Sequence, residues 1–319
     1  MLCRMHTRSS KHSKLLIARS KRGYSQHRSI ALSSNRRPQI YNTVDDLRQF
    51  LNQGRQQGHT IGFVPTMGSL HQGHLDLVQK ASELADIVVV SIFVNPMQFG
   101  PHEDFDAYPR TLDSDCDALS DCRCDAVFAP TVREIYPKGV NTEIDVPGLS
   151  TILCGHHRPG HFKGVATVVT KLLNIVQPEI AVFGNKDYQQ LQVIRTLVTD
   201  LLMPVEIIGA DTTREPSGLA MSSRNAYLSA TERDTASRLY ASLQAIGEAL
   251  KNDQQVATTL REQRERLAAA GFVIDYLEIR DANDLSQSYV ESETAVILVA
   301  ARLGQARLID NLVVSLASK

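Results

Sequence analysis

Two histidines that lie three residues apart form the first part of this 319-residue chain that could carry chemistry. His71 and His74 follow an apolar run at residues 61–64, then Pro65 and a turn that begins at Gly68. The run predicts a buried strand, and the apolar periodicity after His74 predicts a helix. The first N–H groups of a helix are free, and the helix dipole favours anions there. The pattern therefore predicts a phosphate site, with two ordinary surface histidines at a turn as the alternative.

Polar side chains also follow two further apolar runs that predict strands. These side chains are Asn95 and Gln98 after the first run, and Lys186, Asp187 and Gln190 after the second. In open α/β sheets, ligands bind at the carboxyl ends of the strands. Asn95 and Gln98 have ordinary turn residues as their alternative interpretation, but their place at the end of a central strand favours a functional site.

A glycine-rich, basic loop contains Arg158, which can bind a carboxylate or a phosphate with two parallel hydrogen bonds. Gly155 and Gly160 have the spacing of a P-loop, but His161 and Phe162 stand where that motif requires Lys and Ser or Thr. The P-loop is therefore rejected, while an anion-binding role for the loop and its Arg158 remains.

A second polar loop, at residues 213–225, contains Ser222, Ser223 and Arg224. Hydroxyl groups beside a guanidinium suit a polyphosphate. A linker is the alternative that the composition alone favours.

The elements that must position these side chains follow a β–α alternation from residue 60 to 209, which predicts a doubly wound parallel α/β sheet. The predicted strands cover residues 61–64, 87–94, 126–130, 180–184 and 205–209, with a short strand outside the repeat at 142–146. The predicted helices that flank them include residues 41–58, 113–120 and 165–176, and a helix that the segment 185–190 opens and that runs to about residue 201.

The order of predicted helices and strands changes near residue 212, where the β–α alternation ends. Two long amphipathic helices at 230–250 and 255–270 precede three strands at 273–279, 295–301 and 306–314. We therefore expect a smaller C-terminal α+β domain that begins at residue 213.

Charge is distributed unevenly along the chain. Residues 1–44 contain ten of the 34 Lys and Arg and no Asp or Glu, so the remainder carries a net charge of −11. The basic, Ser-rich arm at 1–39 predicts a mitochondrial transit peptide, and hence the matrix. A disordered basic arm, as on a cytoplasmic protein, and a start codon placed too far upstream are the alternatives. The acidic body would repel phosphate backbones, which argues against a nucleic-acid partner.

The five cysteines are too few for a disulfide scaffold, and their number is odd, which indicates a reducing compartment. Cys116, Cys122 and Cys124 cluster, but their spacing is not that of a zinc site, so no protein-bound metal is expected. No apolar run approaches the ~18–20 residues of a membrane span, so no membrane partner is expected.

Six motifs, in order along the chain, resemble those of the pantothenate synthetase family, the ATP-dependent pantoate–β-alanine ligases of the coenzyme A pathway. The motifs are PTMGSLHQGH, VNPMQFG, DAYPRT, RPGHFKGV, FGNKDYQQ and TREPSGLAMSSRN. The resemblance implies a Rossmann-type, nucleotidyltransferase-like domain at 40–212, a lid domain at 213–319 and a homodimer. It implies that pantoate is joined to β-alanine through a pantoyl adenylate, with release of pyrophosphate and AMP. ATP would enter with Mg²⁺ as a substrate complex, and no tightly bound cofactor is implied.

The resemblance also implies roles for residues of this chain. His74, together with His71 and Lys186, is implied in catalysis. The residues implied in ATP binding are Met67, His71, His74, Gly184, Lys186, Asp187, Met221, Ser222, Ser223 and Arg224. The residues implied in pantoate binding are Gln98, Gln190 and Met67. Asn95, Arg158 and His161 are implied in the pocket without a defined role.

One departure from the family pattern lies beside the predicted site, because Asn185 stands where the family commonly has an acidic residue. An inactive homologue that serves as a binding or scaffold protein is one alternative, and the presence of every polar motif residue argues against it. Another adenylyltransferase is disfavoured by the two glutamines. A class I aminoacyl-tRNA synthetase is disfavoured by the acidic body and by the lack of an anticodon-binding extension.

Overall fold

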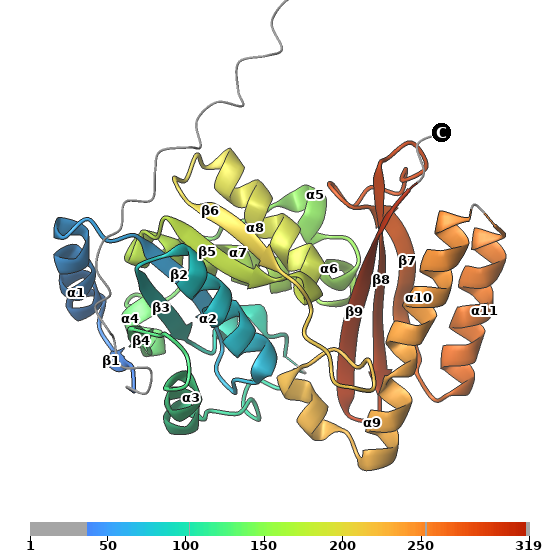
Figure 1. The fold of residues 1–319 in the computed structure, drawn as a ribbon, viewed down its shortest axis with the longest axis horizontal. Helices are drawn as coiled ribbons and strands as arrows, with labels where there is room; N and C mark the ends of the chain where they lie inside the picture. Colours follow the sequence, from blue (N-terminus) through green and yellow to red (C-terminus); the bar gives the residue numbers. More distant parts are fainter. Residues whose placement is uncertain (1–36, 102, 253, 317–319) are drawn as a thin grey trace, which may run out of the picture. The chain divides into compact units, whose positions relative to one another are not determined.

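The computed structural model describes residues 37–101, 103–252 and 254–316, all of which belong to one compact unit (Figure 1). The predicted N-terminal arm falls almost wholly on residues 1–36, outside the described residues. Among the helices described, none is both long and apolar enough to cross a bilayer.

In the described part of the chain, a parallel sheet of six strands has the order β1-β4-β3-β2-β5-β6. Its strands are β1 (Gln39–Tyr41), β2 (Ile61–Thr66), β3 (Ile87–Ile92), β4 (Ala126–Phe128), β5 (Ile180–Gly184) and β6 (Glu206–Ala210). The strand order reverses between β2 and β5, which is the topological switch point of a doubly wound sheet. The predicted fold class is therefore confirmed.

Helices cover both faces of this sheet (Figure 1). They are α1 (Val44–Gln56), α2 (Gln72–Leu84), α3 (Leu112–Leu119), α4 (Val132–Ile135), α5 (Pro147–Ser150), α6 (Cys154–His157), α7 (His161–Val176) and α8 (Tyr188–Asp200). Two short 3₁₀ segments follow strands, η1 (Pro96–Gln98) after β3 and η2 (Asn185–Asp187) after β5.

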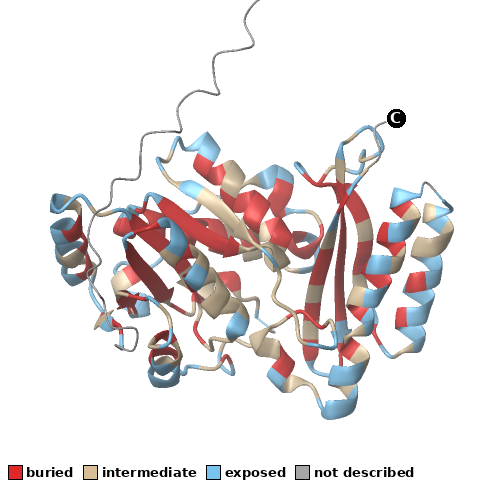
Figure 2. Cartoon of the chain, in the orientation of Figure 1, coloured by how far each residue is buried: buried red, intermediate tan, exposed pale blue. Residues whose placement is uncertain are grey.

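Strand β3 shows why the sheet is covered on both sides. Successive side chains of a strand point to opposite faces. Ile87 and Val89 pack in one apolar cluster with residues of α7, while Val88 and Val90 pack in another with residues of α2. A run of apolar residues without alternation is the consequence, and Figure 2 shows the strand buried along its length.

The end of β2 explains why β2 and β5 separate at the switch point. The strand predicted over residues 61–64 is too short, because β2 continues through Pro65 to Thr66, in register with β3. Pairing with β5, in contrast, involves only Gly62 and Phe63. Because proline has no N–H to donate to a ladder, β2 and β5 separate beyond Phe63 and leave room between their carboxyl ends.

A second sheet of three antiparallel strands follows, in the order β7-β8-β9, over the described residues. Its elements are η3 (Ser223–Tyr227), α9 (Ala230–Ala236), α10 (Arg238–Lys251), α11 (Val256–Ala269), β7 (Val273–Asp281), β8 (Thr294–Leu303) and β9 (Ala306–Ser315). Helices α10 and α11 pack on one face of this sheet (Figure 1). The predicted C-terminal α+β region is confirmed as a fold, while a domain boundary at residue 213 stays a prediction.

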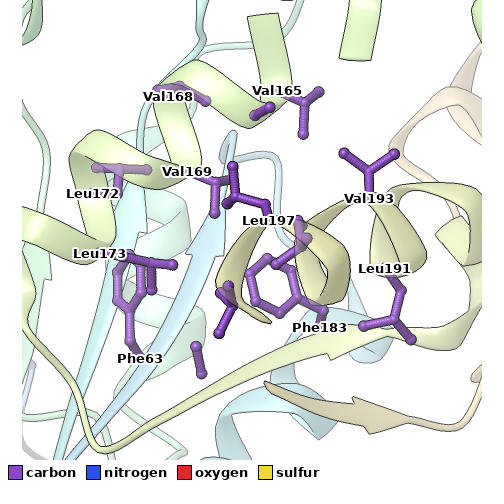
Figure 3. Packing of buried hydrophobic residues seen from close by; sticks show 14 of the residues in the cluster. Phe63, Val165, Val168, Val169, Leu172, Leu173, Phe183, Leu191, Val193 and Leu197 are labelled. Carbon is purple, nitrogen blue, oxygen red and sulfur yellow. The ribbon is translucent and has the colours of Figure 1, made fainter. Parts of the chain in front are cut away.

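One apolar cluster joins the two sheets. Phe183 on β5 and Leu191 on α8 belong to the same cluster as Tyr276 on β7 and Leu298 on β8. Figure 3 shows the α7 and α8 part of this cluster, with side chains of both helices gathered around Phe63 and Phe183. The face of the smaller sheet that lies opposite α10 and α11 is thus covered by helices that flank the larger sheet.

Two predicted elements differ from the structure. No strand forms among the described residues 142–146, because the backbone there bonds to side chains: Ile144 N–H donates to Thr167 Oγ1, and Val146 N–H donates to Asp145 Oδ1. The helix expected over 230–250 is interrupted at Ser237, whose hydroxyl donates to Asp234 O, a bond that competes with helix propagation.

Candidate active site

A cavity of about 200 Å³ lies at the carboxyl ends of β2 and β5, where the two strands separate. The structure places most of the residues predicted for the site on its wall. These residues are Met67, His71, His74, Gln98, Gly184, Lys186, Asp187, Gln190 and Met221. Residues that are distant in sequence but follow different strands therefore meet at one edge of the sheet, as the switch-point rule requires.

The histidine pair opens α2 at the wall of this cavity. The two imidazole rings are 4.0 Å apart between centroids. The backbone N–H of His71 donates to His74 Nδ1 over 3.3 Å. In a neutral imidazole only one nitrogen carries hydrogen, so His74 has its proton on Nε2 and can donate from that atom. Glycine suits position 73 between the two histidines, because the Cβ of any other residue there would stand only 3.0 Å from the His71 ring.

Both histidines are neutral at pH 7. Burial, and then the charge of Lys186, lowers the pKa of His71 from 6.5 to about 4. Burial, followed by His71 and Lys186, lowers the pKa of His74 well below its ordinary value. His71 Nδ1 is buried and has no hydrogen-bond partner within the described residues. Buried polar atoms rarely stay unpaired, so the pair has unused capacity for a ligand.

Lys186 supplies positive charge to the cavity from η2. Its ammonium is 3.9 Å from the carboxylate of Asp187, a distance too long for a hydrogen bond. Lys186 lines both this cavity and a second one of about 360 Å³, as do Asp187 and Gln190. The lysine is therefore placed where one ligand could extend across both cavities.

Gly184 ends β5 without obstructing the cavity. A Cβ built at this position would meet no atom within 4 Å. The space that a side chain would occupy is therefore open to a ligand, as the predicted role of Gly184 requires.

Gln98 is held in one orientation by a buried network. Its Oε1 accepts from Asn95 Nδ2 over 3.2 Å, and its Nε2 donates to Met67 Sδ over 3.0 Å. Asn95, which is 1% exposed, also accepts from Tyr136 Oη over 2.9 Å and donates to Gly164 O. The structure thus places Asn95 behind the cavity wall, where it supports Gln98.

Much of the remaining cavity wall is apolar, and most of these apolar residues belong to the cluster of which Figure 3 shows a part. Its apolar residues include Pro65, Leu77, Phe93, Val165, Val168, Val169, Leu172 and Phe183. A ligand that fits this cavity must present both apolar groups and anionic or hydroxyl groups.

The two predicted arginines are paired with carboxylates. Arg158 donates to Glu103 from Nε over 2.6 Å and from Nη2 over 2.5 Å. Arg224 donates to Asp104 from Nε over 3.1 Å and from Nη2 over 2.9 Å. Both arginines line the second cavity. An anion that binds either guanidinium must therefore compete with an adjacent carboxylate.

His161 is part of the Arg158 arrangement. Because Arg158 can only donate, its contact of 3.0 Å makes His161 Nε2 the acceptor. The proton is therefore on Nδ1, which donates to Gln98 O over 2.8 Å. Burial, and then the charge of Arg158, lowers the pKa of His161 to about 3. His161 is thus a neutral bridge between Arg158 and the Gln98 backbone.

The serine loop closes onto the turn that precedes α2. Ser223 Oγ donates to Ser69 O over 3.1 Å. Ser222 caps the N-terminus of η3, and its Oγ accepts from Arg224 N–H over 3.3 Å. Ser222 lines the second cavity and Met221 the first, whereas Ser223 lies between the loop and the turn.

Several residues at the site were missed by sequence reasoning. Glu103 and Asp104 lie in an acidic stretch to which no function was assigned, yet they pair with the two arginines. Two adjacent acids, which come two residues after the end of the NPMQFG motif, were the available signal. Tyr136 and Asn311, which contact Asn95 and the Lys186 turn, had no local signal in the sequence.

No group of three or more His, Cys, Asp or Glu side chains that could hold a metal ion occurs among the residues the structure describes.

The sheet order, the switch-point cavity and the histidine-containing helix start define the class of protein, which is a Rossmann-type, nucleotidyltransferase-like α/β protein.

The comparisons with known proteins narrow this class to one family. The family model described as pantoate-beta-alanine ligase matches residues 39–313. A pantothenate synthetase of Shewanella oneidensis is 55% identical over 271 residues, which cover 84% of this chain and 96% of that relative. The chain therefore belongs to the pantoate–β-alanine ligase family.

Solved structures agree with this assignment. Pantothenate synthetase from Thermus thermophilus matches with a TM-score of 0.80 and 47% identity, covering 86% of this chain and 98% of that one. The pantoate-beta-alanine ligase of Francisella tularensis, described as complexed with beta-gamma ATP and beta-alanine, matches with a TM-score of 0.73. It is 36% identical, and the match covers 86% of this chain and 97% of that one.

Proposed function

We propose that this protein joins pantoate to β-alanine with consumption of ATP, which yields pantothenate, AMP and pyrophosphate. The observation that carries the proposal is the composition of the switch-point cavity. It combines neutral hydrogen-bond donors and a lysine with two glutamines and an apolar wall, all within about 200 Å³. Membership of the ligase family supports the same activity.

Pantoate fits the part of the cavity between the glutamines and the apolar wall. It carries a carboxylate, two hydroxyl groups and two methyl groups on one carbon. Gln98 and Gln190 would bond to the oxygen atoms, while Met67 and the valines of α7 would contact the methyl groups. Because Asn95 and Met67 fix the amide of Gln98, that amide is already oriented before the substrate binds.

ATP, entering with Mg²⁺ as its substrate complex, would place its phosphates beside α2 and η2. His74 would donate from Nε2 to a phosphate oxygen, with His71 beside it, and Lys186 would neutralise the β- and γ-phosphates. Asp187 would bind the ribose, and Gly184 would allow the nucleotide to approach closely.

The serine loop would complete the ATP site. Ser222 and Ser223 would donate to the triphosphate, and Arg224 would do so once the phosphates displace Asp104. Met221 would contact the nucleotide from the first cavity. We assign the loop to a lid formed by residues 213–319, which agrees with its contact to Ser69.

Two steps follow from this arrangement. A carboxylate oxygen of pantoate attacks the α-phosphorus of ATP, and the bond to the β-phosphate breaks, so pyrophosphate leaves and pantoyl adenylate forms. The neutral amine of β-alanine then attacks the acyl carbon, the bond from that carbon to the AMP oxygen breaks, and the amine nitrogen releases a proton, so that pantothenate and AMP form. The protein supplies alignment and charge stabilisation and needs no nucleophile of its own.

The cellular setting is part of the same proposal. The bacterial source of the Shewanella and Thermus relatives favours a cytoplasmic enzyme over the mitochondrial alternative. We also propose a homodimer, as the family resemblance implies, and light scattering of the purified chain would measure it.

The experiment that tests the function measures AMP release from ATP and pantoate, with and without β-alanine. We expect AMP only when all three substrates are present. Pantoate alone should support the exchange of labelled pyrophosphate into ATP, because the first step is reversible. Absence of β-alanine-dependent AMP would contradict the proposed function.

A further inference from the structure

Asn311 on β9 contacts the backbone of the turn that carries Lys186. Its Nδ2 atom lies 2.9 Å from the carbonyl oxygen of Asn185 and 2.8 Å from that of Lys186. An amide NH₂ group has two hydrogens, so it can donate one to each carbonyl. Asn311 is 6% exposed, which strengthens hydrogen bonds by excluding water. The smaller sheet thus holds the turn that follows β5.

Asn311 is itself held by the residue before it. Its backbone N–H donates to Asp310 Oδ1 over 2.8 Å. Arg214 donates to both carboxylate oxygens of Asp310, over 2.6 and 2.9 Å. The guanidinium of Arg214 lies over the ring of Tyr240, 3.5 Å from its centroid. A buried carboxylate with three donors is a rigid support, because every movement would break a charge-assisted hydrogen bond.

The Lys186 side chain gains its direction from this backbone. Its ion-pair contact with Asp187 spans 3.9 Å, so the side chain is only loosely fixed at its end. The 3₁₀ segment η2 is three residues long and stands between β5 and α8. A shift of such a short segment would move the ammonium within the cavity, and misplacement of about 1 Å can cost on the order of a hundredfold in rate.

We propose that Asn311 is a positioning residue, which fixes the Asn185–Asp187 turn so that the Lys186 ammonium stays at the phosphate position. The inference rests on the proposed function, in which Lys186 neutralises the phosphates of ATP. Asn311 acts through the turn and has no substrate contact of its own. The C-terminal sheet thereby contributes to adenylate formation through a main-chain contact.

The first test replaces the amide donor. Asn311→Ala removes both hydrogen bonds, and Asn311→Leu removes them without leaving a cavity, because leucine branches at the same carbon and is somewhat larger. We expect each variant to lower kcat for pantoate-dependent pyrophosphate release by about ten- to a hundredfold, since a lost hydrogen bond costs on the order of one decade. The KM for pantoate should change by less than about twofold, because Gln98 and its supports are untouched.

Asn252→Ala is the matched control. Asn252 also donates from Nδ2 to a backbone carbonyl, that of Glu248 over 2.8 Å, but it does so on the exposed end of α10. Its kcat should equal that of the wild type. A wild-type kcat in folded Asn311→Leu would overturn the proposal.

A double-mutant cycle separates positioning from a general structural role. In a Lys186→Ala background there is no ammonium to misplace, so Asn311→Ala should lower the residual rate by less than about twofold. An equal loss in both backgrounds would mean that Asn311 acts on something other than Lys186, and the proposal would be wrong.

Calorimetric titration with Mg·ATP keeps this test separate from the proposed function. If the wild type formed no pyrophosphate from pantoate, the proposed function would fail, yet ATP affinity could still be compared. Asn311→Ala should weaken ATP binding in the wild-type background and not in the Lys186→Ala background. Equal ATP affinity of wild type and Asn311→Ala would contradict the positioning role.

Discussion

His74 enters the cavity as a hydrogen-bond donor and not as a cation. Its Nδ1 accepts from the His71 backbone, so Nε2 keeps the proton, and burial lowers its pKa well below the ordinary value. The fixed positive charge beside the histidines is therefore that of Lys186. In the phosphate site that we propose, the neutral donor supplies geometry and the separate cation supplies charge.

Replacement of Lys186 tests this division. Lys186→Ala should lower the rate of pantoate-dependent pyrophosphate release by about two to four decades, because the charge that stabilises the leaving group is lost. The control is Lys80→Ala on the exposed side of α2, where the lysine pairs with Glu83. A near-normal rate in Lys186→Ala would show that another group neutralises the phosphates.

Asp104 competes with ATP for Arg224 in our proposal. Asp104→Asn removes the competing charge, so the KM for ATP should fall by a factor of about two to five, as expected for a partly exposed ion pair. The exposed neighbour Asp106 provides the control variant, Asp106→Asn. Steady-state kinetics at saturating pantoate would measure the effect. A raised KM would mean that Asp104 assists ATP binding instead.

The residues that the sequence could predict are those adjacent to strands. Lys186, Asp187 and Gln98 follow apolar runs directly, so the switch-point rule places them at one edge of the sheet. The partners of the arginines could not be predicted, because Arg158 and Glu103 are 55 residues apart and Arg224 and Asp104 are 120 apart. Such pairings depend on how loops fold back, for which a local pattern carries no signal.

Helix α7 approaches the turn η1 so closely that only glycine fits between them. A Cβ on Gly164 would stand 2.3 Å from Met97 O and 2.7 Å from Gln98 N. The same turn carries Gln98, and Asn95 is bonded to Gly164 O over 3.1 Å. The position of Gln98, and of the side of the cavity that we propose for pantoate, is thus set by contact between a helix and a turn.

Gly164→Ala tests this contact between elements. We expect it to lower the free energy of unfolding by about 1–3 kcal/mol, as overpacking does, and to raise the KM for pantoate because Gln98 must shift. Gly148→Ala is the control, since a Cβ there would meet no atom within 4 Å. Urea denaturation and steady-state kinetics would measure both effects. An unchanged KM would show that Gln98 does not depend on this packing.

Periodicity predicted most elements but failed where side chains bond to the backbone. Residues 142–146 have strand-forming composition, yet Thr167 takes the N–H of Ile144 that a ladder would need. The helix that was expected to run past Ser237 is interrupted there by a hydroxyl contact. Strand β1 (Gln39–Tyr41), at the edge of the sheet, is only three residues long and too short for a periodic signal.

Over the whole molecule, buried neutral histidines couple stability to pH. The pKa of His71 is about 4 and that of His161 about 3, both below the ordinary 6.5, so the unfolded chain binds more protons than the folded one below pH 6.5. The contribution of these histidines to the free energy of unfolding is therefore fully present above pH 6.5. This contribution is lost as the pH drops towards 4 for His71 and towards 3 for His161.

The pH prediction can be measured by urea denaturation between pH 7.5 and 4.5. The free energy of unfolding should decrease over this range, by at most about 1.4 kcal/mol per pH unit for each histidine. His161→Asn should show a smaller slope than the wild type, whereas His157→Gln, at an exposed position, should keep it. Equal slopes for wild type and His161→Asn would exclude His161 as a source of the dependence.

The change in the order of predicted elements near residue 212 predicted a second fold. It did not predict how far the two folds share an apolar core. Leu298 on β8 and Leu191 on α8 are in one apolar cluster, and Tyr188 Oη donates to Ala282 O over 2.7 Å. Amphipathic patterns show that a face is buried without showing which element covers it. Shared burial is therefore a property of the assembled molecule.

The contact between Asn311 and Lys186 also has a consequence for the order in which the protein is made. The two residues are 125 positions apart, and ribosomes add roughly 5–20 residues per second. The Lys186 turn is thus synthesised about 6–25 s before the amide that holds it. A nascent chain stalled ahead of β9 should bind ATP less tightly than one in which β9 has emerged from the ribosome.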